Sequence, residues 1–168
     1  MRCIADTAVG APTAPLPESR PPVTLREFRA TDLPFVTSIV AEALHEHYDP
    51  GLYGSLATEW PTGFIVAADP TDVPVGFLLG VNQVAGEARV LMFAVDRRQR
   101  SQGTGTLLMS TFFDRCRARG FHRVTLEVRV SNATAIRFYS RYQFSVVDLL
   151  RSYYSDGENG YQMARDLR

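Results

Sequence analysis

Apolar residues recur along this chain at two different spacings. Alternation at every second position, or a short run rich in β-branched residues, predicts strands; these lie at residues 23–27, 64–68, 75–81, 88–95, 124–130, 144–150 and 160–164. Spacings of three and four positions predict helices; these lie at residues 31–44, 105–119 and 132–142, with a short helix near 52–59 inside a loop rich in glycine and proline. This order predicts an α/β (α+β) fold, a mixed sheet with helices on both faces.

The first 21 residues follow neither spacing. They contain Pro12, Pro15, Pro17 and Pro21 among small residues, and proline interrupts both helices and strands. A segment of this composition has little apolar surface to bury. We therefore expect residues 1–21 to form a disordered tail and residues 22–168 to form a single domain.

The charges of the 168 residues balance, with 18 acidic and 18 basic side chains. Without a basic excess the chain is not expected to bind nucleic acid or an anionic membrane surface. No stretch reaches the ~18 apolar residues that a membrane span needs, and no signal peptide is evident, so we expect a cytoplasmic protein. Neither the lone cysteines Cys3 and Cys116 nor His45 and His47, two positions apart, have the spacing of a metal site.

A glycine-containing loop joins the strand that ends at Val95 to the helix that begins near Gly105. Gly103 and Gly105 allow close approach of a ligand, and free N–H groups at a helix start attract anions. Three arginines within residues 97–100 add positive charge. The loop lacks both the Lys-Ser/Thr of a nucleotide P-loop and the dinucleotide fingerprint. Two interpretations remain, a pyrophosphate site or an ordinary strand-to-helix turn beside a solvated basic patch.

The fifth predicted strand carries polar side chains on one face, including Glu127. A central strand covered on both sides is usually apolar on both, so this face is expected to border a polar cleft. Glu127 could act there as a general base, directly or through a water. The alternative is an exposed glutamate paired with Arg123 or Arg129. By position alone, Asn132 would cap the next helix and Tyr139 would pack its ring.

Two segments together resemble the signature of the GNAT acetyltransferases. Residues 100–105 match the R-x-x-G-x-G loop that clasps the pyrophosphate of acetyl-CoA, and residues 126–144 (LEVRVSNATAIRFYSRYQF) are very similar to the second block of RimI-like and archaeal N-terminal acetyltransferases. Residues 60–67 and 152–158 also look like segments of proteins in this subfamily. The resemblance therefore covers about residues 23–167. It implies a seven-stranded, mostly antiparallel mixed sheet, splayed between its fourth and fifth strands to admit pantetheine.

The resemblance also implies roles for single residues. Glu127 would be the general base and Tyr139 the general acid. Acetyl-CoA would be the cosubstrate, without a metal, and its binding residues would be Phe93, Ala94 and Val95 for the pantetheine and thioester, Arg100, Ser101, Gln102, Gly103, Thr104, Gly105 and Thr106 for the pyrophosphate, and Asn132 for the pantetheine arm. Tyr153 and Tyr154 would wall the acceptor entrance, with Tyr48 and Tyr53 as weaker candidates for the opposite wall.

The implied reaction is direct acetyl transfer to a primary amine, most favourably the N-terminal α-amine of a protein or peptide, by a monomer or homodimer. Two alternatives stay open: a GNAT enzyme acting on a small-molecule amine or a lysine side chain, and a non-catalytic acyl-CoA-binding module. The chain departs from the pattern at Asn159-Gly160 and at Gln143, where glycine is usual. We expect the helix before Gln143 to end without a left-handed glycine.

Overall fold

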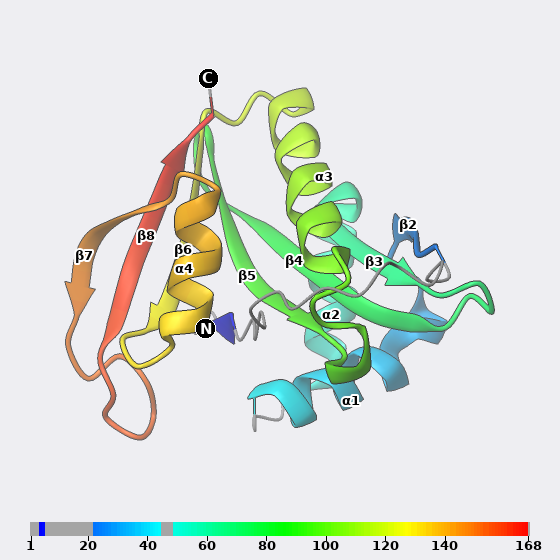
Figure 1. The fold of residues 1–168 in the computed structure, drawn as a ribbon. Helices are drawn as coiled ribbons and strands as arrows, with labels where there is room; N and C mark the ends of the chain where they lie inside the picture. The colour runs from blue at the N-terminus through cyan, green and yellow to red at the C-terminus, as the bar shows by residue number, and fades with distance from the viewer. Residues whose placement is uncertain (1–3, 6–21, 45–48, 168) are drawn as a thin grey trace, which may run out of the picture.

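The computed structural model describes residues 4–5, 22–44 and 49–167 (Figure 1). The helices are α1 (Leu33–Leu44), α2 (Pro50–Glu59), α3 (Thr104–Ala118) and α4 (Ala133–Arg141), with short 3-10 turns η1 (Ala30–Asp32), η2 (Pro61–Gly63) and η3 (Arg97–Gln99). The strands are β1 (Ile4–Ala5), β2 (Thr24–Glu27), β3 (Phe64–Ala68), β4 (Pro74–Val84), β5 (Glu87–Val95), β6 (Arg123–Arg129), β7 (Ser145–Leu150) and β8 (Gly160–Asp166). None of the helices in these ranges is long and apolar enough to cross a membrane.

Seven of these strands form one mixed sheet in the order β2-β3-β4-β5-β6-β8-β7, and β1 pairs with β5 off this path. Every neighbouring pair along this path is antiparallel except β5 and β6, which run parallel. The parallel pair follows from the chain path, because α3 carries the chain back across the sheet between β5 and β6. The expected seven-stranded, mostly antiparallel sheet is thereby confirmed.

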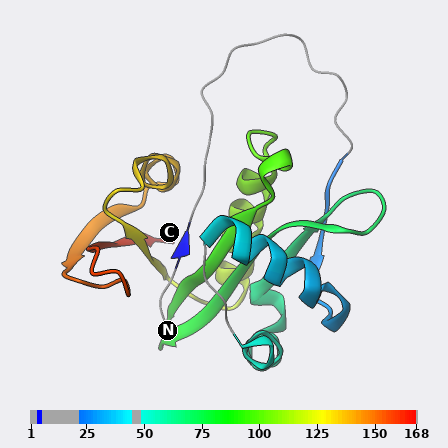
Figure 2. The ribbon, with the colours of Figure 1, turned by 90° about the horizontal axis from the view of Figure 1, so that it is seen from below.

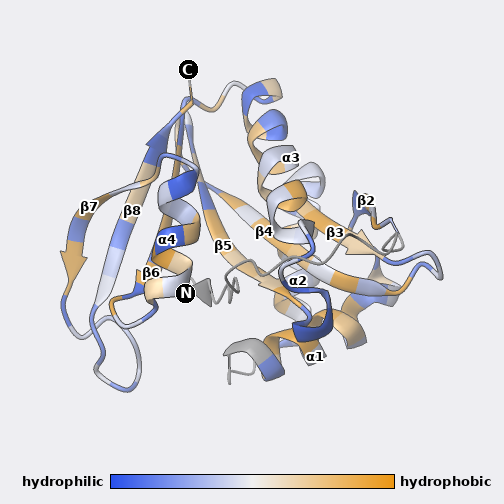
Figure 3. Cartoon of the chain, in the orientation of Figure 1, coloured by the Kyte–Doolittle hydropathy of each residue, from blue (hydrophilic) through white to orange (hydrophobic). Residues whose placement is uncertain are grey.

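An apolar core layer lies on each face of the sheet. Helices α3 and α4 pack on one face through residues such as Phe112 and Phe138. Helices α1 and α2 pack on the other through residues such as Val36 and Tyr53. The central strands supply both layers, and Figure 3 shows that β3 and β5 are largely apolar along their length. Burial on both faces explains the near-continuous apolar runs of these strands.

Strand β5 contains a bulge halfway along its length. Met92 pairs with Leu79 of β4, and Val90 pairs with the next β4 residue, Gly80, so that Leu91 is an extra residue. As a result the side chains of Leu91 and Met92 both lie in the layer under α1 and α2. A bulge bends its strand and increases the local twist. The part of β5 after Leu91 therefore runs at an angle to the part before it.

Beyond this bulge β5 and β6 separate. Their pairing is confined to residues Glu87–Arg89 of β5 and Arg123–Thr125 of β6. From there β5 continues along β4 as far as Val95, while β6 continues along β8 as far as Arg129. The sheet is thus open between the ends of its two parallel strands, at the place where the resemblance implied a splay.

A short strand lies in this opening. Ile4 and Ala5 form β1, which pairs in parallel with Met92 and Phe93 of β5 (Figures 1 and 2). We expected residues 1–21 to form a disordered tail, and within that range the structure describes Ile4 and Ala5 as a strand. The two residues precede the first proline of the segment and meet a strand edge that β6 has left. The remainder of residues 1–21 lies outside the described residues.

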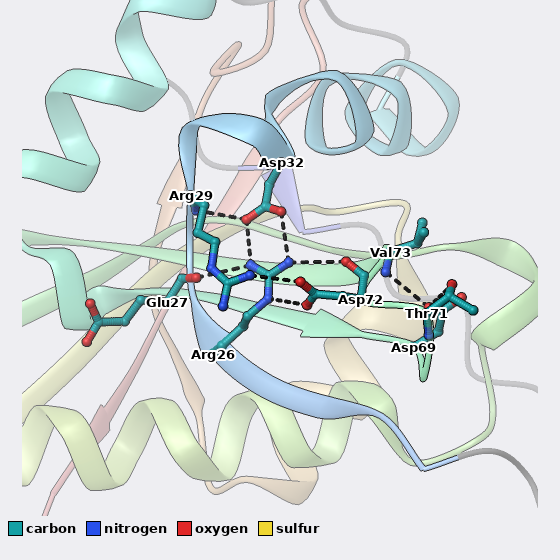
Figure 4. Close-up of polar contacts among 8 residues, drawn as sticks. All are labelled: Arg26, Glu27, Arg29, Asp32, Asp69, Thr71, Asp72 and Val73. Carbon is teal, nitrogen blue, oxygen red and sulfur yellow. Dashed lines mark hydrogen bonds and ion pairs between the residues drawn. The ribbon is translucent and has the colours of Figure 1, made fainter.

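A partly buried ion-pair network joins β2 to the β3–β4 turn (Figure 4). The Arg26 guanidinium donates to both Asp32 oxygens, at 2.7 and 2.9 Å, and its Nε donates to Asp72 at 2.7 Å. Asp32 is 3% exposed and also accepts the Arg29 backbone N–H. Because the carboxylate of Asp32 is fully engaged, its burial carries no unpaired charge.

Helix α4 ends in a left-handed residue, although that residue is not glycine. Gln143 has φ +63°. Its N–H donates to the Ser140 carbonyl and the Phe144 N–H donates to the Tyr139 carbonyl, which are the two hydrogen bonds of a Schellman motif. The turn usually made by glycine therefore persists here with an L-residue in its place.

Candidate functional site

The backbone N–H groups at the start of α3, from Thr104 to Thr106, form a site suited to anions, here called the anion cradle. The N-cap of α3 is Gly103, with φ +86° and no side chain to accept from the first N–H groups of the helix. These N–H groups, from Thr104 to Thr106, have no partner within an α-helix and lie at the positive end of its dipole. Ser101 also has a positive φ of +61°, which curls the loop ahead of the helix. The expected pyrophosphate loop is thus placed at a helix start.

A cavity of about 480 Å³ opens beside this cradle. It lies between the start of α3 and the end of α4, and the residues that line it are Val95, Gln99, Arg100, Ser101, Gly103, Gly105, Thr106, Phe138, Arg141 and Tyr142. Six of these belong to the set expected to bind the cosubstrate. Arg100 donates from Nε to the Val95 carbonyl at 3.0 Å, which ties the loop to the end of β5.

The other expected cosubstrate residues do not line this cavity. Gln102 donates its side-chain amide to the Arg98 carbonyl at 2.7 Å. Phe93 and Ala94 are buried in β5, at 0% and 1% exposure, on the strand that borders the opening. Asn132 caps α4 by accepting the Ala135 N–H at 3.0 Å. The cap agrees with the reading of Asn132 from its position alone.

Glu127 lies on β6 next to the opening and is buried, at 3% exposure. Arg89 of β5 donates to the same carboxylate oxygen from Nε at 2.8 Å and from Nη2 at 2.7 Å. Arg89 also donates from Nη2 to the Tyr153 hydroxyl at 3.0 Å. One guanidinium therefore connects the proposed base to the β7–β8 loop, across the point where the two parallel strands separate.

The Arg89 contact was missed by the sequence analysis. We considered Arg123 and Arg129 as partners of Glu127, because they are close to it in sequence. The structure pairs Arg123 with Asp166 and Arg129 with Asp156 and Glu158. Arg89 is 38 residues from Glu127 in the chain, and the only signal that could have found it is the adjacency of β5 and β6 in the sheet.

Tyr139 is fully buried in α4 and faces the sheet. Its ring lies 6.4 Å from the Phe93 ring and 5.7 Å from the Phe144 ring, centroid to centroid. Phe93 belongs to β5, the strand that borders the opening. The ring of Tyr139 therefore packs against β5 from the side on which α4 lies. Packing of this ring, which its sequence position suggested, is what the structure shows.

The four tyrosines expected near an acceptor are placed differently from one another. Tyr153 is half-buried and contacts Arg89, while Tyr154 is buried under the Arg129 guanidinium, whose Cζ is 4.0 Å from the ring centroid. Tyr53 is fully buried in the layer under α1 and α2, and burial raises its pKa to about 12. Tyr48 lies outside the described residues.

The cavity also contains residues that the sequence did not single out. Arg141 and Tyr142 at the end of α4, with Phe138 one turn earlier, form the wall opposite the α3 cradle. Arg141 adds a second cation to the one supplied by Arg100. Only the close approach of α4 to α3 brings Phe138 and Arg141 to the cavity.

The sheet is open between two parallel strands, and the anion cradle lies at the start of the next helix. This arrangement suits an extended ligand that ends in phosphate groups. This is the architecture of an acyl-carrier-dependent transferase. The profile of the acetyltransferase (GNAT) family matches residues 25–144, and the chain belongs to that family.

Individual relatives place the chain more closely within this family. The structure of Ard1 from Thermoplasma volcanium is 41% identical, covering 87% of this chain and 98% of that one, with a TM-score of 0.83. An uncharacterised N-acetyltransferase of Methanocaldococcus jannaschii is 34% identical, covering 84% of this chain and 90% of its own length. An N-alpha-acetyltransferase of Sulfurisphaera tokodaii is 31% identical, covering 85% and 92%. The resemblance noted in the sequence is thereby confirmed.

Proposed function

We propose that this protein is an acetyl-CoA-dependent N-acetyltransferase of the RimI-like and archaeal N-terminal type, whose acceptor is the N-terminal α-amine of a protein or peptide. The observation that carries the proposal is the placement of a buried carboxylate, Glu127, beside a sheet opening that leads to the α3 anion cradle. The name N-alpha-acetyltransferase, given to the Sulfurisphaera tokodaii relative, supports the choice of acceptor.

The residues around the cavity fit the pyrophosphate of acetyl-CoA. The N–H groups of Thr104 to Thr106 would donate to phosphate oxygens, and Arg100 and Arg141 would balance their charge from two sides. The backbone of Phe93 to Val95 would accompany the pantetheine arm along the opening. When bound, the cosubstrate supplies an activated thioester carbonyl.

The transfer proceeds by direct attack of the amine, without an acyl-enzyme. Cys116 is buried in α3, and burial raises the pKa of its thiol to about 12, so it forms little thiolate at neutral pH. A new bond joins the amine nitrogen to the acetyl carbon, and the bond from that carbon to sulfur breaks. Glu127 accepts the amine proton, directly or through a water, and Tyr139 gives a proton to the departing sulfur.

The acceptor class follows from how readily an amine loses its proton. An α-amine has a pKa near ~8 and a lysine side chain near ~10.4, so making the amine neutral at pH 7 costs about 1 kcal/mol in the first case and about 5 in the second. Glu127 already shares its charge with the Arg89 guanidinium. A site of this kind suits the amine that is more easily neutralised.

The roles of Glu127 and Tyr139 are tested by conservative substitutions. Glu127→Gln and Tyr139→Phe should each lower kcat by about 10²–10⁴, the usual contribution of a general base or acid, while the Kd for CoA stays within a factor of about two. Turnover is measured as thiol release with a free-amine peptide, and the Kd by calorimetry. The matched control is Tyr161→Phe on β8, which should change neither quantity. Unchanged kcat in both active-site variants would remove the assignments.

The acceptor is tested with peptide pairs. A peptide with a free α-amine and no lysine should be acetylated, whereas the same peptide with a blocked α-amine and one lysine should not. Activity confined to the lysine peptide, or to a small amine, would favour the first alternative. CoA binding without thiol release from any amine would favour the non-catalytic module.

On the acceptor side, Tyr153 and Tyr154 are proposed to form a wall of the entrance for the peptide. Tyr153 is held by the guanidinium that holds Glu127, so a peptide that contacts this ring lies next to the base. We place the reaction in the cytoplasm, with the protein acting as a monomer or homodimer on newly exposed N-termini.

A further inference from the structure

The opening between β5 and β6 is a buried strand edge. Neither Met92 nor Phe93 pairs with β6, because the ladder to that strand ends at Arg89, and both are 0% exposed in the structure, in which β1 covers this edge. Backbone N–H and C=O groups that are shielded from water need hydrogen-bond partners. A buried edge of this kind therefore favours the addition of another extended chain.

In this structure the added chain is β1. Ile4 pairs with Met92 and Ala5 pairs with Phe93, in parallel, and β1 lies between β5 and β6 in both views (Figures 1 and 2). Phe93 is also the first of the three β5 residues proposed to contact the pantetheine and thioester. The same backbone cannot pair with β1 and with the two amide groups of pantetheine at once.

We propose that the edge of β5 at Met92 and Phe93 is a strand-binding surface whose occupant in the free protein is the chain's own β1, so that β1 and the pantetheine arm of CoA compete for it. This inference rests on the proposed function, since it concerns the site assigned to acetyl-CoA. Binding of the cosubstrate then requires β1 to leave, and the apparent affinity is lowered by the fraction of molecules in which β1 is docked.

Proline substitution tests the competition in the full chain. The double variant Ile4→Pro, Ala5→Pro removes two backbone donors and disfavours pairing, while leaving every residue of the opening unchanged. If β1 is docked in about two thirds to nine tenths of the free molecules, the variant should bind CoA about three- to tenfold more tightly by calorimetry. The matched control, Ala14→Pro, lies outside β1 in a segment already rich in proline and should bind as the unchanged chain does.

A second measurement follows β1 directly, without any substitution. Cys3 precedes β1 in the sequence, and the other cysteine, Cys116, is buried with its thiol pKa raised, so a fluorophore can be attached to Cys3 selectively. Adding CoA should lower the fluorescence anisotropy as β1 is displaced, and the midpoint should equal the calorimetric Kd.

The outcomes separate this inference from the proposed function. Tighter binding by the proline variant, together with a fall in anisotropy, supports the competition. Equal CoA affinity in all three proteins with constant anisotropy overturns the competition and leaves the proposed function in place. Absence of CoA binding in all three overturns both.

Discussion

At the scale of single residues, the contact between Arg89 and Glu127 links stability to the candidate site. Both side chains are largely buried, at 13% and 4% exposure. Arg89→Met would leave a buried carboxylate without its partner, which typically costs about 3–5 kcal/mol of unfolding free energy. Urea unfolding at pH 7 measures this loss. Adding Glu127→Leu to the Arg89→Met variant should restore most of the stability, but not activity.

The control for this prediction is a solvent-exposed ion pair that also involves β6 but joins it to β8. Arg123 pairs with Asp166 at 3.0 Å, and the two side chains are 33% and 61% exposed. Arg123→Met should change the unfolding free energy by no more than about 1 kcal/mol. Equal effects of Arg89→Met and Arg123→Met would show that burial of the Arg89 contact contributes nothing.

Gln143 offers a second prediction at this scale. An L-residue in the left-handed region carries a steric cost of about 1–2 kcal/mol, which glycine avoids, and glycine in turn loses more backbone freedom on folding. Gln143→Gly should therefore raise the unfolding free energy by about 1 kcal/mol, as measured by urea unfolding, because the φ of +63° is relaxed.

The reciprocal variant is available at the end of α3. Gly120 has φ +82°, its N–H donates to Arg117 as that of Gln143 does to Ser140, and a Cβ there would meet no atom within 4 Å. Gly120→Gln should lower stability by about the amount that Gln143→Gly raises it. Shifts of the same sign in the two variants would contradict the backbone explanation.

Sequence reasoning located unusual single residues better than their partners. Glu127 was selected as a polar residue on a strand expected to be apolar, and in the structure it is buried, while its role as a general base stays a prediction. Its partner could not be chosen, because pairing across the sheet depends on which strands are neighbours. Gln143 was recognised as unusual, but the sequence gives no sign that the left-handed turn survives the loss of glycine.

At the scale of elements, the cavity depends on the approach of α4 to α3. Arg141 lines the cavity, whereas Arg137, one turn earlier on α4, is exposed and contacts only its neighbour Thr134 among the described contacts. Arg141→Ala should weaken CoA binding about tenfold through loss of a charge-assisted contact, more at low salt than at high salt. Arg137→Ala is the matched control. Calorimetric titrations at two salt concentrations distinguish a local contact from a general charge effect.

The connection between β2 and the β3–β4 turn should depend on pH. The side-chain hydrogen bond from Arg26 lowers the pKa of Asp72 below its usual value. A carboxyl group with a lowered folded pKa contributes stability above its unfolded pKa, about 4, and this contribution is lost as the pH falls through the folded pKa. Thermal melts should therefore show Asp72→Asn to be less stable than the unchanged chain at pH 7, with the difference shrinking as the pH falls below the unfolded pKa of about 4. A constant difference would rule out titration of Asp72.

Regular elements were predicted well because their signals are local. The strand at residues 64–68 has the predicted bounds, and α3 begins one residue before its predicted start. β1 was missed because two residues carry no periodicity, and it exists only through its pairing with β5. The bulge at Leu91 was also missed, because an extra residue in an apolar run leaves the run apolar.

At the scale of the whole molecule, the sheet consists of two halves with few direct links. One half contains β2 to β5, and the other contains β6 to β8; they share three parallel pairs. Aromatic contacts across the boundary supplement these pairs: Phe93 with Phe138 at 5.6 Å, and Phe113 with Phe144 at 6.0 Å, between ring centroids. These ring contacts add apolar packing between the two halves where the backbone pairing is absent.

The bulge in β5 has a consequence for how readily such a protein could change during evolution. Because Leu91 and Met92 face the same layer, loss of the single codon for Leu91 would join Val90 to Met92 in regular alternation and would leave every later residue of β5 on its present face. Loss of the codon for Ala94, in the regular part of the strand, would instead turn Val95 to the opposite face, away from the mouth of the cavity. Descendants of this gene should therefore tolerate a change of length at the bulge and vary elsewhere in β5 by substitution.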